Sequence, residues 1–155
     1  MSNPLWDYSL ATYRVEEVAT TCLTLQDTYG VDVNLLLYAA WLAHINRRLS
    51  AAHLNEVDAL VTPWRDSVVR PLRQLRRELR GYSQAAGVRE ELKALELRAE
   101  REQQDQMHAF YRRSAELPHE DNPLRDNLAQ VTRLASPENR GWEREITHLA
   151  CLISP

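Results

Sequence analysis

The feature that most constrains the fold is an almost uninterrupted apolar run at residues 33–45. Of its 13 residues, 11 are apolar, and the exceptions are Asn34 and His44. A helix that is apolar on every side belongs at the centre of a helical bundle, where neighbouring helices cover all of its surface. No segment of the chain alternates apolar and polar residues for long enough to predict a strand. The sequence therefore predicts an all-α fold built around a central helix over about residues 33–49.

The turn that precedes this run is also specified locally. Apolar residues spaced three, four and seven apart predict a helix over about residues 15–29. Gly30 is suited to end that helix in a left-handed conformation, and Asp32 is suited to cap the next one. Gln26 and Asn34 are thereby predicted to lie at the same helix–helix corner.

A long antiparallel hairpin is predicted downstream. Its two helices cover about residues 55–80, restarting at Thr62-Pro63, and residues 88–117, with a loop at 81–87. Pro71 lies inside the first of them and predicts a kink near residues 67–71. At 1.5 Å per residue, the second helix is roughly 45 Å long, so part of it is expected to overhang the core.

Asn-Pro and Ser-Pro pairs predict where the other helices begin. Asn3-Pro4 opens a first short helix, Asn122-Pro123 opens a later one, and Ser136-Pro137 opens the last. The total is six or seven helices. A chain of 155 residues is one domain on ordinary expectations, so residues 1–155 are predicted to form a single helical bundle.

Composition narrows the classes of function. The net charge of −3 disfavours a general nucleic-acid binder. Cys22 and Cys151 lie in apolar helical patterns that are typical of free thiols. No signal peptide is indicated, and no apolar stretch is long enough to span a bilayer. These features predict a cytoplasmic protein.

Catalytic and metal-binding motifs are missing from the sequence. The five histidines never pair at i, i+4, and none forms a zinc-protease pattern with a glutamate. There is no glycine-rich phosphate loop and no pair of cysteines with two residues between them. We therefore expect no cofactor, no metal and no catalytic residue.

The leading candidate for a binding surface is an arginine cluster in the first hairpin helix. Arg73, Arg76, Arg77 and Arg80 spread over about 100° of that helix, at 100° per residue. Such a face can be exposed to solvent or paired with acidic residues of the same protein. It can also bind an acidic protein partner, or RNA or another ligand that carries phosphate groups. Asp27 is predicted to pair with one of these arginines. The leading hypothesis is a non-enzymatic adaptor that binds a protein partner through this face.

Two other functions are possible, and the polar stretch of the second hairpin helix carries a separate prediction. Gln26, Asp27, Asn34 and Arg73 could instead line a pocket for a small molecule or an anion, in a binding protein or an enzyme. The polar stretch at residues 100–106 of the second hairpin helix is predicted to be solvent-exposed, or to contact a second copy in a homodimer. The other possible function is that of an RNA- or ribosome-associated factor.

The chain also resembles a known family. The matching features are Trp6, Tyr13, the CLxLQDxxGxDVNLLL block at residues 22–37, and Trp41-Leu42. Trp64, Pro71-Leu72-Arg73 and Arg76-Arg77 match more loosely. On these residues the chain resembles an uncharacterised proteobacterial family of small proteins carrying a domain of unknown function. The resemblance covers residues 5–80 and implies no activity, cofactor or catalytic residue.

Overall fold

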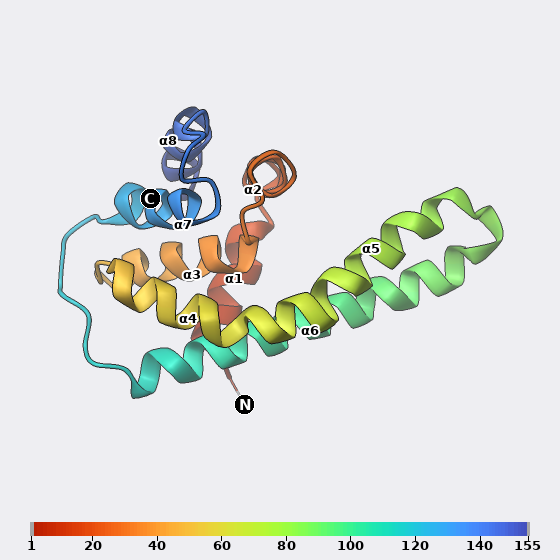
Figure 1. Cartoon of the computed structure of the whole chain (residues 1–155), viewed down its shortest axis with the longest axis horizontal. Coiled ribbons are helices and arrows are strands. Elements are labelled where there is room, and N and C mark those ends of the chain that lie inside the picture. The colour runs from red at the N-terminus through yellow and green to blue at the C-terminus, as the bar shows by residue number, and fades with distance from the viewer. Residues whose placement is uncertain (1, 155) are drawn as a thin grey trace.

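The computed structural model describes residues 2–154, and within them the prediction of an all-α fold is confirmed (Figure 1). In chain order the α-helices are α1 (Pro4–Tyr13), α2 (Glu16–Tyr29), α3 (Val33–His44), α4 (Ala51–Trp64), α5 (Arg70–Glu78), α6 (Ala86–Arg113), α7 (Leu124–Ala135) and α8 (Glu143–Ile153). A π-helical segment, Arg65–Val69, joins α4 to α5 in one bent rod, so the described chain forms seven rods. None of the described residues forms a strand, and no helix among them is long and apolar enough to cross a membrane.

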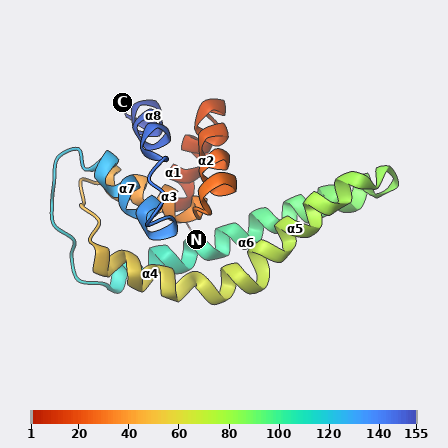
Figure 2. The same cartoon turned by 45° about the horizontal axis from the view of Figure 1, so that its top comes forward.

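Helix α3 is the centre of the bundle. All ten of its residues from Asn34 to Ala43 are buried, as the apolar run predicts. Helix α7 packs along it, and α1, α2 and α6 contact it from other sides. Figures 1 and 2 show this group of helices as the body of the molecule.

The central helix is shorter than predicted, because it ends at His44 and does not continue to residue 49. Asn46 adopts a positive φ of 57°, which no α-helix can accommodate. The segment that follows is held from α7 by the buried Asn127, whose Oδ1 accepts from the amide of Leu49 at 2.9 Å. The Nδ2 of Asn127 donates to the carbonyl of Arg47 at 3.0 Å. The chain thus leaves the core at Asn46 and is fixed by a side chain distant in sequence.

The turn between α2 and α3 forms as predicted. Gly30 has a φ of 70° and its amide donates to the carbonyl of Gln26 at 3.1 Å, which ends α2. The Oδ1 of Asp32 accepts from the amide of Asn34 at 2.8 Å and caps α3.

The predicted hairpin is present, and its far part, formed by α5 and the first half of α6, projects from the body (Figures 1 and 2). The predicted restart at Thr62-Pro63 is wrong, because α4 continues through Pro63. The irregularity lies instead at Arg65–Val69, where the amide of Arg70 donates to the carbonyl of Arg65, five residues earlier. Pro71 has no N–H to offer, and a π-turn just before it absorbs the disruption without breaking the rod.

The prediction for the polar stretch of α6 is wrong in part. Glu102 is exposed, but Gln103 and Gln104 are only 0% and 1% exposed. Their side-chain amides can be buried because Asp32 and Asn34, at the start of α3, are their hydrogen-bond partners. The inner face of α6 is therefore polar where it meets the apolar central helix.

Candidate ligand pocket

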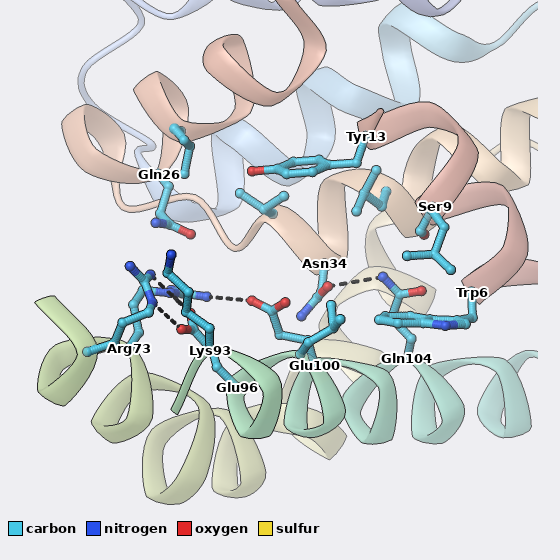
Figure 3. A pocket seen from close by; sticks show the side chains of 16 residues that line it. Trp6, Ser9, Tyr13, Gln26, Asn34, Arg73, Lys93, Glu96, Glu100 and Gln104 are labelled. Carbon is cyan, nitrogen blue, oxygen red and sulfur yellow. Dashed lines mark hydrogen bonds and ion pairs between the residues drawn. The ribbon is translucent and has the colours of Figure 1, made fainter. Parts of the chain in front are cut away.

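A cavity of about 420 Å³ lies between α1, α2, α3, α5 and α6 (Figure 3). Apolar side chains, among them Leu10, Leu37 and Leu97, form much of its wall. The polar lining residues are Ser9, Tyr13, Gln26, Asn34, Arg73, Arg76, Lys93, Glu96, Glu100 and Gln104. In Figure 3, Trp6, Ser9 and Gln104 lie at one end, Arg73 and Lys93 at the other, and Tyr13, Asn34 and Glu100 between them.

One wall of the pocket is positioned by the start of α1. The Oδ1 of Asn3 accepts from the amides of Leu5 and Trp6 at 2.9 and 3.3 Å, as an N-cap does. The Nδ2 of the same residue donates to Asp105 of α6 at 2.7 Å. Asn3 therefore both starts α1 and ties it to α6, which fixes Trp6 at the end of the pocket.

A chain of side-chain hydrogen bonds runs from Asp32 and Gln103, which lie outside the pocket lining, to the lining residues Asn34 and Gln104. The Nε2 of Gln103 donates to Asp32 Oδ2 at 2.8 Å, and the Nδ2 of Asn34 donates to Gln103 Oε1 at 3.3 Å. The Nε2 of Gln104 then donates to Asn34 Oδ1 at 3.0 Å. We name this series the Asp32–Gln104 chain.

The direction of the Asp32–Gln104 chain is set by its first member. A carboxylate accepts hydrogen bonds, and Asp32 Oδ2 accepts one from Arg65 Nη1 at 2.8 Å as well as the one from Gln103. Each amide must then point its NH₂ group toward Asp32 and its carbonyl away from it. The chain consequently ends in the carbonyl oxygen Oε1 of Gln104, which is buried and has no hydrogen-bond partner within residues 2–154.

A second buried polar atom at the same end of the pocket is also unpartnered. The Oγ of Ser9 makes no hydrogen bond to any described residue. Figure 3 places Ser9 and Gln104 on the same side, next to Trp6. This end of the pocket thus contains two polar atoms that the described protein does not satisfy.

Five charged side chains line the rest of the pocket: Arg73, Arg76, Lys93, Glu96 and Glu100. Glu96 is buried and accepts from Arg73 Nε at 3.3 Å and from Arg76 Nε. The Nη2 of Arg73 also donates to Glu100 Oε1 at 3.3 Å. The two arginines are therefore committed to glutamates of α6, and these pairs join α5 to α6 beside the pocket.

Burial raises the pKa of Glu100 from its ordinary value of 4.5 to about 7. Loss of hydration is the largest cause; the pairing with Arg73 opposes it, and the charges of Glu96 and Asp32 add to it. Burial also raises the pKa of Tyr13 to about 12, so its phenol stays protonated at neutral pH. Glu100 is consequently the lining group that exchanges a proton near pH 7.

The structure distributes the predicted site residues over three environments. The pocket is lined by Gln26, Asn34, Arg73 and Arg76. Asp27 forms its predicted arginine pair with Arg77 at 3.1 Å, on the exposed surface outside the pocket. Arg80 is exposed in the turn Leu79–Gly81. The seven residues therefore do not form one site.

The polar residues of α6 in and beside the pocket were not among the predicted site residues. Glu96, Glu100, Gln103 and Gln104 are spaced i, i+4, i+7 and i+8, which places them on one helical face. This spacing indicates a polar stripe along one side of the helix, and it was the signal in the sequence that could have identified these residues. Within residues 2–154 no group of three or more His, Cys, Asp or Glu side chains could hold a metal ion.

Comparison with known protein families gives a match over most of the chain. The family model described as "Protein of unknown function (DUF2390)" matches residues 4–107. The chain belongs to this family. In this DUF2390 protein the matched region runs from the first residue of α1 to Met107 in α6, so it contains all 16 residues that line the pocket. No curated protein and no solved structure matches the chain.

Proposed function

We propose that this DUF2390 protein binds a small organic molecule in the pocket between α1, α2, α3, α5 and α6. The observation that carries the proposal is the convergence of Gln26, Asn34, Arg73 and Glu100 on one cavity of about 420 Å³. Ligand pockets in proteins measure roughly 300–1,000 Å³ and combine an apolar wall with a few oriented polar groups. This cavity has both properties.

The unpartnered atoms at the Trp6 end support the same proposal. Nearly all buried polar groups in native proteins have a hydrogen-bond partner, and each one that does not costs roughly 1–3 kcal/mol. Gln104 Oε1 and Ser9 Oγ are two such atoms, on different helices, and both residues line the pocket. Neither atom is accessible from the cavity as the structure stands, so a bound molecule would remove that cost only by turning these two side chains toward it.

The adaptor hypothesis stays a prediction, and we rank it second because two of its four arginines are paired within the hairpin. Arg73 and Arg76 donate to Glu96 and Glu100 inside the hairpin, so an acidic partner would have to break these pairs to use them. Such a partner would lose part of its binding energy to that exchange.

The test is an NMR titration of the full-length, ¹⁵N-labelled protein with cationic, neutral and anionic benzene derivatives. We expect at least one of them to cause saturable shifts centred on the amides and the indole N–H of the pocket, including those of Trp6, Asn34 and Gln104. A Leu97→Trp variant should abolish these shifts by filling the pocket, because Leu97 lines it and is 48% exposed, so the larger ring can be tolerated.

Leu95→Trp is the matched control. Leu95 is on the same helix and 46% exposed, but it faces a different cavity. Shifts that survive in the Leu97→Trp variant, or a panel in which no member shifts the pocket residues, would contradict the proposed function.

A further inference from the structure

We infer that the ligand of this pocket is an organic carboxylate, an aromatic or aliphatic body that carries one carboxylate group. The inference rests on the proposed function, because it names the class of molecule that the pocket binds. Its basis is a group of hydrogen-bond donors at one end of the cavity, which we call the donor end. These donors belong to Tyr13, Gln26, Arg73 and Lys93 (Figure 3).

Two neutral donors at the donor end are unused. The hydroxyl of Tyr13 and the side-chain amide of Gln26 make no hydrogen bond to any of residues 2–154. Both groups are accessible, unlike Ser9 Oγ and Gln104 Oε1, which are buried. In Figure 3 the hydroxyl of Tyr13 points toward Gln26. Burial raises the pKa of Tyr13 to about 12, so the hydroxyl keeps its proton and can donate it to a ligand.

The two cations at the donor end also have N–H groups to spare. A guanidinium has five N–H groups, and Arg73 uses Nε on Glu96 and Nη2 on Glu100, whereas its Nη1 donates to no described residue. Lys93 Nζ lies 3.1 Å from Glu90 Oε1, but both side chains of this pair are exposed, and such pairs are weak. An anion can therefore bind these cations without breaking a buried ion pair.

The charges of the lining residues favour a ligand with one negative charge. Arg73, Arg76 and Lys93 carry three positive charges, whereas Glu96 and Glu100 carry at most two negative ones. Glu96 accepts from both arginines. Glu100 keeps one oxygen without a described partner, but its pKa of about 7 leaves it partly neutral at pH 7. One carboxylate balances the remaining positive charge, whereas a phosphate monoester would bring nearly two negative charges.

The remainder of the pocket suits an apolar body. From the donor end the cavity extends toward Trp6, and Leu10, Leu37 and Leu97 form an apolar wall (Figure 3). A ligand with its carboxylate at the donor end would place its ring or chain against these side chains. The two parts of the pocket thus match the two parts of one molecule.

The test is a calorimetric titration of the full-length protein with three matched probes: 3-phenylpropionate, 2-phenylethanol and 2-phenylethylamine. At pH 7 we expect the Kd of the acid to be at least tenfold lower than that of the alcohol or the amine. Leu97→Trp should abolish binding of the acid, because the larger ring fills the pocket that Leu97 lines.

Tyr13→Phe tests the neutral donors. The variant removes a hydroxyl that has no partner in the described part of the chain, so the fold should be kept. The Kd of the acid should rise about tenfold, as expected for the loss of a hydrogen bond to a charged group, and that of the alcohol should rise less. Tyr82→Phe is the matched control and should change neither value, because Tyr82 is exposed and lies outside the pocket.

Lys93→Gln tests the charge at the donor end. The Kd of the acid should rise about three- to fivefold, whereas that of the alcohol should stay constant. Arg98→Gln is the matched control, because Arg98 is exposed on the same helix and lines a different cavity. It should leave the Kd of the acid unchanged.

The outcomes separate this inference from the proposed function. If the alcohol or the amine binds in the pocket as tightly as the acid, or if neither Tyr13→Phe nor Lys93→Gln weakens binding of the acid, the ligand class is wrong and the pocket remains a binding site. If none of the three probes binds, or if Leu97→Trp leaves their binding unchanged, the ligand class and the proposed function are both contradicted.

Discussion

Replacing Glu100 with glutamine should stabilise the protein, and the gain should grow with pH. The folded state holds the proton of Glu100 with a pKa of about 7, against 4.5 for an ordinary glutamate. Since the folded pKa is the higher one, protonation stabilises the fold fully below pH 4.5, and this stabilisation is lost as the pH rises through 7. Glutamine has the shape of the protonated acid and cannot lose that proton.

The magnitude follows from the two pKa values. At 1.36 kcal/mol for each tenfold change, the difference between 4.5 and about 7 corresponds to about 3 kcal/mol of unfolding free energy. Glu100→Gln should therefore exceed the native protein by about 1 kcal/mol at pH 5 and by about 3 kcal/mol at pH 8. Most of the change should fall between pH 5 and pH 7.

Urea denaturation followed by circular dichroism, at intervals from pH 5 to pH 9, measures this difference. Glu102→Gln is the control, because Glu102 lies on the exposed face of α6, and it should stay within about 0.5 kcal/mol of the native protein at every pH. A Glu100→Gln variant that is less stable than the native protein, or that differs from it by the same amount at every pH, would refute the reasoning.

Two further substitutions test other parts of the fold. Asp32→Asn should cost about 3 kcal/mol in urea denaturation, because it breaks a nearly buried ion pair with Arg65 while keeping a capping side chain. Asp58→Asn should cost clearly less, since Asp58 contacts the same arginine but is 28% exposed against 11% for Asp32, and equal losses would contradict this reasoning. Gly30→Ala should lower the unfolding free energy by about 1 kcal/mol because φ is 70°, whereas Gly81→Ala should change it by a few tenths; a neutral Gly30→Ala would show that the turn relaxes without strain.

The elements that the sequence predicted well depend on local signals. The apolar run at residues 33–45 identified the central helix, and Gly30 and Asp32 identified the turn before it. These residues act within one helical turn, through a left-handed φ and a cap hydrogen bond. Their effect can be read without knowing what packs against them.

The elements that were missed depend on contacts distant in sequence. Gln103 meets Asp32 across 71 positions, and Gln104 meets Asn34 across 70. A glutamine on α6 looks like a solvated residue until α3 is placed beside it. The early end of α3 is similar, because it depends on Asn127, which is 78 positions from Leu49.

The candidate site was predicted in part for the same reason. Gln26, Asn34, Arg73 and Arg76 were selected as polar residues near a corner, and they do line the pocket. Glu100, whose pKa is raised to about 7, was predicted to lie in a stretch that is exposed to solvent or contacts a second copy. Its pKa is set by burial and by charges on other helices, which no periodic pattern records.

The most direct test of the ligand pocket is a set of crystal structures after soaking with a cationic, a neutral and an anionic benzene derivative. We predict electron density for at least one of these compounds inside the cavity, with its ring against the apolar part of the wall. A cavity that contains only ordered water in all three soaks would contradict the existence of a small-molecule site between these helices.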